Sequence, residues 1–222
     1  MPRARPQRFA RRARRCRSRA ARRVVAGADW MSAVDILLLH SVFGLRPAVH
    51  AAADRLREAG HEVHVPDLFD GRTAETVEDG MRISEEIGRD ELLRRAVQVA
   101  APLSARGLVY AGFSLGAALA QNLALADEKA RGLLLLHGTS DIAENAAVDD
   151  LQVQLHVADP DPFESEDWLN SWYLRMQRAG AEVEVFRYAG AGHLYTDPSL
   201  PDHDAEAARK TWNIAVDFLG SL

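Results

Sequence analysis

Residues 107–127 read GLVYAGFSLGAALAQNLALAD, and this stretch decides the fold that the chain of 222 residues is expected to adopt. Leu108 to Ala111 form a short, continuous apolar run, which is typical of a strand buried on both faces of a sheet. From Leu115 to Asp127 the chain is rich in alanine and leucine, which favours a helix. A buried strand followed at once by a helix is the repeating unit of parallel α/β sheets.

The same alternation continues outward along the chain, from Val34 to the C-terminus. Short apolar runs predict strands at Asp35 to His40, Glu62 to Val65, Gly107 to Ala111, Gly132 to His137, Gln152 to Val157 and Glu182 to Tyr188. Amphipathic runs predict helices at Pro47 to Ala59, Arg89 to Ala101, Leu115 to Asp127, Ser165 to Ala179 and Asp204 to Leu219. The polar stretch Asp67 to Gly88 holds three glycines and predicts a crossover loop with some helix. The sequence therefore predicts an α/β fold with a mostly parallel central sheet and helices on both faces.

The composition favours one domain, which we expect to span residues 31–222. A chain of this length with 47% hydrophobic residues can build one substantial core. No apolar run approaches the roughly 18 residues that a membrane span needs. Cys16 is the only cysteine, so nothing requires an oxidising compartment. We therefore expect a soluble, cytoplasmic protein, a monomer or homodimer, that does not contact membranes.

The N-terminal residues differ from the rest in charge. Eleven arginines lie between Arg3 and Arg23, and the first acidic residue is Asp29. Without these arginines the chain has 16 basic and 32 acidic residues, which is a net charge of −16. We therefore do not expect the folded domain to bind nucleic acid. We interpret residues 1–30 as a disordered extension, with a transit peptide or a nucleic-acid arm as the alternatives. Met31 stands where a domain would begin, and translation from it would lose little.

The pentapeptide Gly112-Phe113-Ser114-Leu115-Gly116 is the main chemical signal in the sequence. Glycines two residues away on both sides allow Ser114 to occupy a tight, strained turn between strand and helix, with its hydroxyl exposed. The Leu115 amide would lie at a helix N-terminus, where an unpaired N–H can stabilise a developing oxyanion. We therefore predict that Ser114 is a nucleophile and that Leu115 contributes to an oxyanion hole.

A serine nucleophile needs a base, and His193 is the best candidate among eight histidines. It alone lies in a glycine-rich loop beyond the last predicted strand, in Gly190-Ala191-Gly192-His193. His40, His137 and His156 stand at strand ends and are second-line candidates. His61 and His64 are expected to face opposite sides of a strand, so they do not form a metal pair. We predict no metal site, and we expect His50 and His203 at the surface.

The remaining parts of such a site are an acid and a second oxyanion donor. Asp159 and Asp161 both follow the strand that ends at Val157, and both are candidates for the acid. The loop after the first strand begins at His40, and we assign the Val42 amide as the second donor. Further residues expected to line a pocket are His40, Ser41, Phe43, Phe113 and Tyr195.

Together these segments resemble the dienelactone hydrolase family of α/β-hydrolases, over nearly the whole chain from Val34. The matching pieces are Phe43-Gly44-Leu45-Arg46-Pro47, Pro66-Asp67-Leu68-Phe69 with Gly71, Gly112 to Gly116, His156 to Phe163 and Tyr188 to His193. The order of serine, acid and histidine along the chain is also that of the α/β-hydrolase fold.

The resemblance implies a compact α/β-hydrolase domain without a large cap, which cleaves a small ester or lactone without a cofactor. By position it assigns Ser114 as nucleophile, Asp161 rather than Asp159 as acid, and His193 as base. The dienelactone hydrolases proper use cysteine as nucleophile and place an arginine shortly after the histidine. Here Ser114 makes the chain a serine variant, and no arginine closely follows His193.

Two other functions are compatible with the same residues. A short-chain carboxylesterase or thioesterase would use the same triad on a different acyl compound, and a panel of substrates would separate these reactions. A catalytically silent member of the fold would bind a ligand or partner instead, and it would not react with a probe for active serines.

Overall fold

Apolar strands form the centre of the computed structural model, which describes residues 33–222. The strands are β1 (Asp35–Leu39), β2 (Glu62–His64), β3 (Leu108–Phe113), β4 (Gly132–Leu136), β5 (Gln152–Asp159) and β6 (Glu182–Ala189). The helices are α1 (Pro47–Glu58), α2 (Val77–Ile87), α3 (Arg89–Ala100), α4 (Leu115–Ala126), α5 (Glu166–Ala179) and α6 (Ala205–Ser221), with a short 3-10 turn at Ser104–Arg106. The α/β fold class predicted from the sequence is confirmed.

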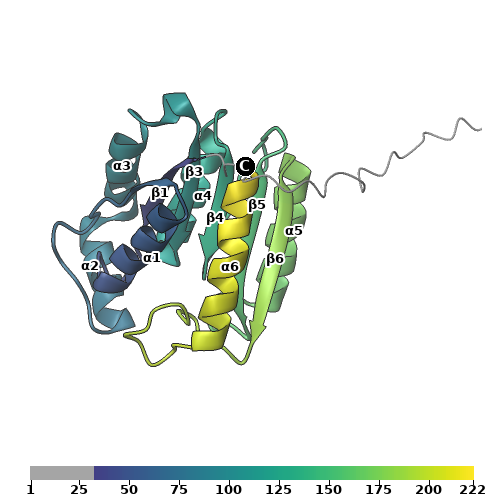
Figure 1. The fold of residues 1–222 in the computed structure, drawn as a ribbon. Helices are drawn as coiled ribbons and strands as arrows, with labels where there is room; N and C mark the ends of the chain where they lie inside the picture. The colour runs from purple at the N-terminus through teal and green to yellow at the C-terminus, as the bar shows by residue number, and fades with distance from the viewer. Residues whose placement is uncertain (1–32) are drawn as a thin grey trace, which may run out of the picture. The chain divides into compact units, whose positions relative to one another are not determined.

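The six strands form one parallel sheet in the order β2-β1-β3-β4-β5-β6 (Figure 1). In its centre, Leu37 of β1 is in register with Tyr110 of β3, which is in register with Leu133 of β4. Because the strands are parallel, their carboxyl ends meet at one edge of the sheet, where open α/β sheets place their sites. Ser114 directly follows β3 at this edge.

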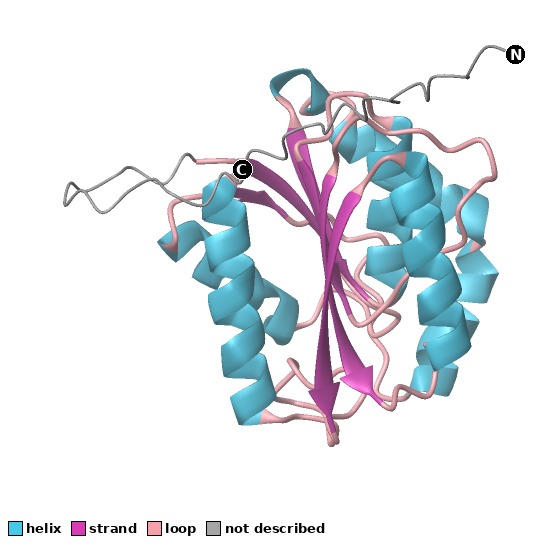
Figure 2. Cartoon of the chain, turned by 90° about the vertical axis from the view of Figure 1, so that its right-hand side faces the viewer, coloured by secondary structure: helices cyan, strands magenta, loops and turns pink. Residues whose placement is uncertain are grey.

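Helices cover both faces of the sheet (Figure 2). On one face α1 and α6 pack on the strands, and Trp212 of α6 is buried there. On the other face α3, α4 and α5 pack through residues such as Leu92, Leu119 and Trp172. β1, β3 and β4 are buried on both faces, because these two layers enclose them.

The predicted elements are confirmed, and their bounds differ by a few residues. β3 runs through Gly112 and Phe113, two residues beyond the expected end, so the strand leads directly into Ser114. The stretch from Asp67 to Gly88 contains a well-formed helix, α2, which we expected only as part of a loop. Thr76 caps this helix by accepting a hydrogen bond from the Asp79 amide. Within α2 only Gly80 is fully buried, and the apolar residues Val77, Ile83 and Ile87 pack against the core while partly exposed.

None of the helices in the described part is long and apolar enough to cross a membrane. The Arg-rich extension predicted for residues 1–30, and Met31, lie outside the described residues.

Candidate active site

Ser114 lies in a strained turn between β3 and α4. Its backbone has φ 49° and ψ −108°, a conformation that non-glycine residues rarely adopt. A Cβ at Gly112 would lie 2.3 Å from the carbonyl of Gly116, and a Cβ at Gly116 would lie 2.3 Å from the carbonyl oxygen of Leu39. The two glycines therefore allow the turn to close against itself and against β1, which holds the Ser114 side chain at the edge of the sheet.

Two later loops bring a histidine and an aspartate to Ser114. The Nε2 atom of His193 lies 3.0 Å from the Ser114 Oγ. Its Nδ1 atom lies 2.8 and 3.0 Å from the two carboxylate oxygens of Asp161. An ionised carboxylate only accepts hydrogen bonds, so Nδ1 carries the proton and Nε2 is free to accept from the serine hydroxyl. The three residues form a continuous chain of hydrogen bonds.

The structure brings Asp161 to His193 and leaves Asp159 apart from it. The Asp161 side chain is fully buried, and its Oδ1 also accepts hydrogen bonds from the Phe163 and Glu164 amides. Asp159 is exposed at the end of β5, where its carbonyl accepts a hydrogen bond from the Gly190 amide. Three donors therefore bind this buried carboxylate and fix its position beside His193.

The two amides expected in an oxyanion hole lie beside the serine. Leu115 is the first residue of α4, so its N–H has no acceptor within the helix. Val42 lies in the turn after β1 and lines the same hollow as Ser114 and Leu115. In the part of the chain that the structure describes, neither amide donates to another group.

Close backbone contacts hold the turn that carries Val42. A Cβ at Gly80, inside α2, would lie 2.4 Å from the Val42 carbonyl oxygen. A Cβ at Gly44 would lie equally close, at 2.4 Å, to the carbonyl oxygen of Arg72. The Ala74 amide also donates to the Phe43 carbonyl. The segment between β2 and α3 therefore fixes this turn in place.

A hollow of about 210 Å³ opens beside the Ser114 hydroxyl. Most of its wall is apolar, and its lining residues are Val42, Phe43, Val77, Met81, Ser114, Leu115, Ala118, Gly138, Thr139, Phe163, Glu164, His193 and Leu194. We call it the site hollow. Its walls come from five loops and two helices that are far apart in the sequence.

Of the five residues expected to line a pocket, only Phe43 faces the site hollow. His40 is fully buried, and it accepts a hydrogen bond from the Leu68 amide at Nε2 while Nδ1 donates to the Ser41 carbonyl. Ser41 and Phe113 line a separate small space near Trp212. Tyr195 is buried, and its hydroxyl bonds to Thr211. A position near the end of a strand places a residue at the correct edge of the sheet, but it does not determine whether the side chain points toward Ser114.

His156 and His137, which were second-line candidates for the base, are buried in the interior of the protein. His156 is buried between Tyr188 and Gln154, which bond to its two ring nitrogens, and burial lowers its pKa to about 3. His137 is buried behind His193, with ring centroids 6.3 Å apart, and its Nε2 lies 2.6 Å from the Thr196 hydroxyl. Burial and the nearby His193 hold the pKa of His137 well below its usual value. Both rings are therefore neutral.

Sequence reasoning missed Glu164, a buried carboxylate in the wall of the site hollow. Its two oxygens accept hydrogen bonds from the Thr139 amide (2.9 Å) and the Thr139 hydroxyl (2.7 Å). Burial raises its pKa, while the bonds from Thr139 act in the opposite direction. The only signal available was its position three residues after Asp161.

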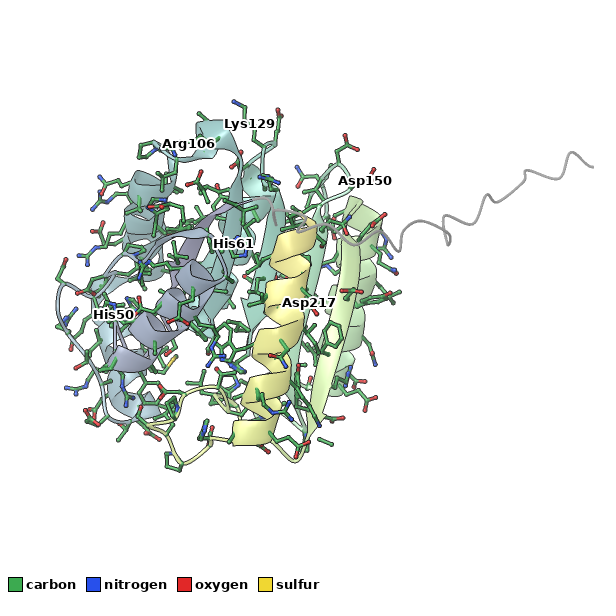
Figure 3. All side chains as sticks on the ribbon, viewed as in Figure 1. His50, His61, Arg106, Lys129, Asp150 and Asp217 are labelled. Atoms are coloured by element: carbon green, nitrogen blue, oxygen red, sulfur yellow. The ribbon has the colours of Figure 1, made fainter. Side chains whose placement is uncertain are left out.

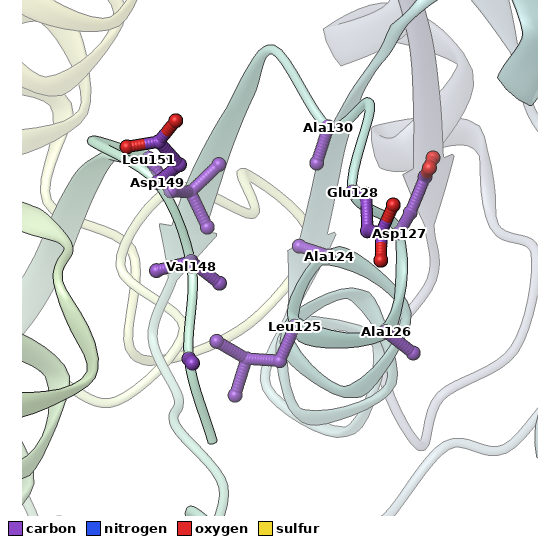
Figure 4. Close-up of a pocket in the computed structure, with 10 residues that line it drawn as sticks. Ala124, Leu125, Ala126, Asp127, Glu128, Ala130, Val148, Asp149 and Leu151 are labelled. Carbon is purple, nitrogen blue, oxygen red and sulfur yellow. The ribbon is translucent and has the colours of Figure 1, made fainter.

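Other features of the described part lie away from this edge. A hollow of about 620 Å³ opens at the far end of α4 from Ser114, between Leu125, Asp127 and Val148 (Figure 4). Arg106, Lys129 and Asp150 project from loops at the end of the molecule opposite the loop that follows β6 (Figure 3). His50 is exposed, and His61 is buried and accepts from the Val34 amide. Within residues 33–222, no three His, Cys, Asp or Glu side chains gather as a metal site requires.

The parallel sheet, with a serine at the turn after β3 and His193 and Asp161 in later loops, defines the chain as an α/β-hydrolase. The model of the dienelactone hydrolase family matches residues 22–222. The chain therefore belongs to the dienelactone hydrolase family, which confirms the resemblance seen in the sequence.

Solved structures show the same fold. A dienelactone hydrolase-like promiscuous phosphotriesterase from metagenomic libraries is 18% identical, with a TM-score of 0.72 over 85% of this chain and 86% of that one. A candidate dienelactone hydrolase from Klebsiella pneumoniae is 14% identical, with a TM-score of 0.70 over 86% and 89%. The esterase LipW from Mycobacterium marinum is 20% identical, with a TM-score of 0.62 over 85% and 73%. A comparison with curated proteins found no match.

Proposed function

We propose that this protein is a serine hydrolase that cleaves a small ester or lactone through an acyl-enzyme. The observation that carries the proposal is the chain of hydrogen bonds from Ser114 through His193 to Asp161, at 3.0 and 2.8 Å. Hydrogen-bond reach between nucleophile and base, with the base oriented by a third group, is the arrangement that activates a serine.

The reaction begins when the Ser114 oxygen attacks the substrate carbonyl and its proton passes to His193 Nε2. Asp161 holds the imidazole in the required tautomer and stabilises the imidazolium that forms. The Val42 and Leu115 amides donate to the oxygen that becomes negative. His193 then returns the proton to the leaving alcohol oxygen, which gives the Ser114 ester and the free alcohol.

Water completes the cycle by the reverse sequence. His193 takes a proton from water as the water oxygen attacks the acyl carbon, and it then protonates the Ser114 oxygen as the acid departs. The cycle needs no cofactor, since each proton returns to its starting group.

Replacing Ser114 by alanine tests the proposal. Ser114→Ala should lower kcat/KM for 4-nitrophenyl acetate by about 10⁴-fold or more, because the nucleophile is lost. The matched control is Ser104→Ala, a partly exposed serine before β3 at the other end of the sheet, which should keep full activity. Activity retained in Ser114→Ala, with Ser104→Ala equally active, would contradict the assignment.

A panel of esters, lactones and thioesters, each run with Ser114→Ala as the blank, then separates the ester or lactone hydrolase from a thioesterase. If the wild-type protein cleaves none of them and Ser114 stays unmodified by an active-serine probe, the chain is a silent member of its family.

A further inference from the structure

The wall of the site hollow is apolar up to its mouth. Met81 is 46% exposed and Phe163 is 59% exposed, and both side chains line the hollow. Large exposed apolar side chains are ordinary when single, but two that border one cavity form a continuous apolar surface. Deeper in the hollow, Val42, Phe43 and Leu194 continue this surface toward Ser114.

Glu164 is the one acidic side chain in this wall. Only 9% of the residue is exposed, and both carboxylate oxygens accept hydrogen bonds from Thr139. Two accepted bonds match the ionised carboxylate, which only accepts. A second carboxylate placed in the hollow would meet this charge in a partly desolvated space, where repulsion is stronger than in water.

No lysine or arginine lines the site hollow among residues 33–222. Two arginines lie close to its wall: the Arg46 guanidinium is 5.2 Å from the centre of the Phe43 ring, and Arg89 lines an adjoining hollow of about 450 Å³ that shares Thr139 and Glu164 with the site hollow. Arg89 is exposed, and its guanidinium lies 3.5 Å from the Ser140 hydroxyl. An anionic group in the site hollow would therefore be repelled by Glu164, and no lysine or arginine in the described part of the chain lines the hollow to attract it.

We propose that the site hollow selects esters with a short, neutral, apolar acyl group, and that Glu164 is the residue that excludes acyl groups ending in a carboxylate. The inference rests on the proposed ester hydrolysis and specifies its substrate. A hollow of about 210 Å³ with a mostly apolar wall suits a short apolar acyl group.

Two substrates that differ in charge and by one methyl group test the proposal. One is the 4-nitrophenyl ester of adipic acid with its second carboxyl group free, and the other is the same compound with that group methylated. The wild-type protein should cleave the methylated compound with a kcat/KM about tenfold or more above that of the free acid. In Glu164→Gln this ratio should fall to about threefold or less, since glutamine keeps a carbonyl acceptor for Thr139 and removes the charge.

A second pair of variants keeps the test valid if Glu164→Gln folds poorly. Met81→Lys places a cation at the mouth of the site hollow and should raise kcat/KM for the free acid several-fold. Leu174→Lys makes the same change on α5, at a side chain that is 58% exposed and outside the hollow, and should leave the ratio as in wild type.

Equal cleavage of the two compounds, or a preference for the free acid, would overturn the inference. A preference for the free acid that Arg89→Gln abolishes would assign substrate recognition to the adjoining hollow instead. A wild-type ratio that Glu164→Gln and Met81→Lys both leave unchanged would also refute the role of Glu164. Failure to cleave either compound in a Ser114-dependent way counts against the ester hydrolysis itself, so the two failures are distinguishable.

Discussion

At the scale of single residues, Ser114 depends on neighbours that have no side chain. Its φ of 49° is maintained because Gly112 and Gly116 let the backbone of α4 approach β3 and β1 closely. Strain of this kind costs on the order of 1–3 kcal/mol and persists only where the surrounding structure enforces it. The glycines of the pentapeptide thus have a packing role that is separate from the chemistry of the serine.

Gly116→Ala should destabilise the protein even though alanine favours helices. Its Cβ would lie 2.3 Å from the Leu39 carbonyl oxygen and 2.5 Å from that of His40, and neither backbone atom can move freely. We expect the free energy of unfolding, measured with urea, to fall by about 2–4 kcal/mol.

The matched control for this change is Gly132→Ala. Its Cβ would meet chiefly the side chain of Leu222, the last residue, which can rotate away. The control should lose about 1 kcal/mol or less. Equal losses in the two variants would contradict the role given to the Gly116 contact.

At the scale of elements, the sequence predicts the strands and helices that have a clear apolar pattern. It does not predict an element whose position depends on contacts with residues far away in the sequence. β1, β3 and β4 are continuous apolar runs, so their place in a buried sheet could be predicted. α2 was expected only as part of a loop, because the stretch around it is polar and holds three glycines, and its apolar residues Val77, Ile83 and Ile87 are only partly buried against the core.

The residues of the candidate site also fall into two groups: those that a local sequence pattern reveals and those that only the fold brings together. Ser114 and His193 stand in local patterns that the sequence displays. The choice of Asp161 over Asp159 depends on which carboxylate reaches His193. The structure places an Asp161 carboxylate oxygen 2.8 Å from His193 Nδ1, and only the tertiary fold determines this contact. Thr139 and Glu164 meet only because the loops after β4 and β5 lie side by side, so no local pattern marks them.

α2 supports the turn that carries Val42, so Gly80→Ala should impair catalysis. The added methyl group would lie 2.4 Å from the Val42 carbonyl oxygen and displace the turn. If the Val42 amide stabilises the oxyanion, kcat for 4-nitrophenyl acetate should fall by about 10- to 100-fold with little change in KM.

Glu85→Ala, at an exposed position on the same helix, is the control and should keep wild-type kcat. Helix propensity alone would make Gly80→Ala about 1 kcal/mol more stable. A stabilised Gly80→Ala with unchanged kcat would show that α2 does not position Val42.

At the scale of the whole molecule, buried neutral histidines link folding to pH. Burial lowers the pKa of His40, His137 and His156 in the folded protein, to about 3 for His156. An unfolded histidine has a pKa of about 6.5, so below this pH the unfolded chain binds protons that the folded protein does not. Stability is therefore complete above about pH 6.5 and is lost as the pH falls toward 3. The raised pKa of Glu164 acts in the opposite direction.

His156 alone should remove about 2 kcal/mol from the free energy of unfolding between pH 6.5 and 5. Urea denaturation across this range should show the loss, and His156→Gln, which cannot take up a proton, should flatten the slope. The exposed His50→Gln should retain the wild-type slope. A His156→Gln protein with an unchanged slope would contradict this assignment.

The residues of the proposed site all follow β1, so a protein that starts at Met31 should keep full activity. Turnover of 4-nitrophenyl acetate by the shortened and full-length proteins, at equal concentration, measures this. A folded but inactive shortened protein would show that the first 30 residues contribute to function.

The central claim is that Ser114 is a nucleophile activated by His193 and Asp161. Labelling of the native protein with a fluorophosphonate, followed by peptide mass spectrometry, tests it most directly. We expect one adduct, on Ser114, formed far more slowly in His193→Ala and absent in Ser114→Ala. An adduct on another residue, or an unlabelled Ser114 in a correctly folded wild-type protein, would contradict it.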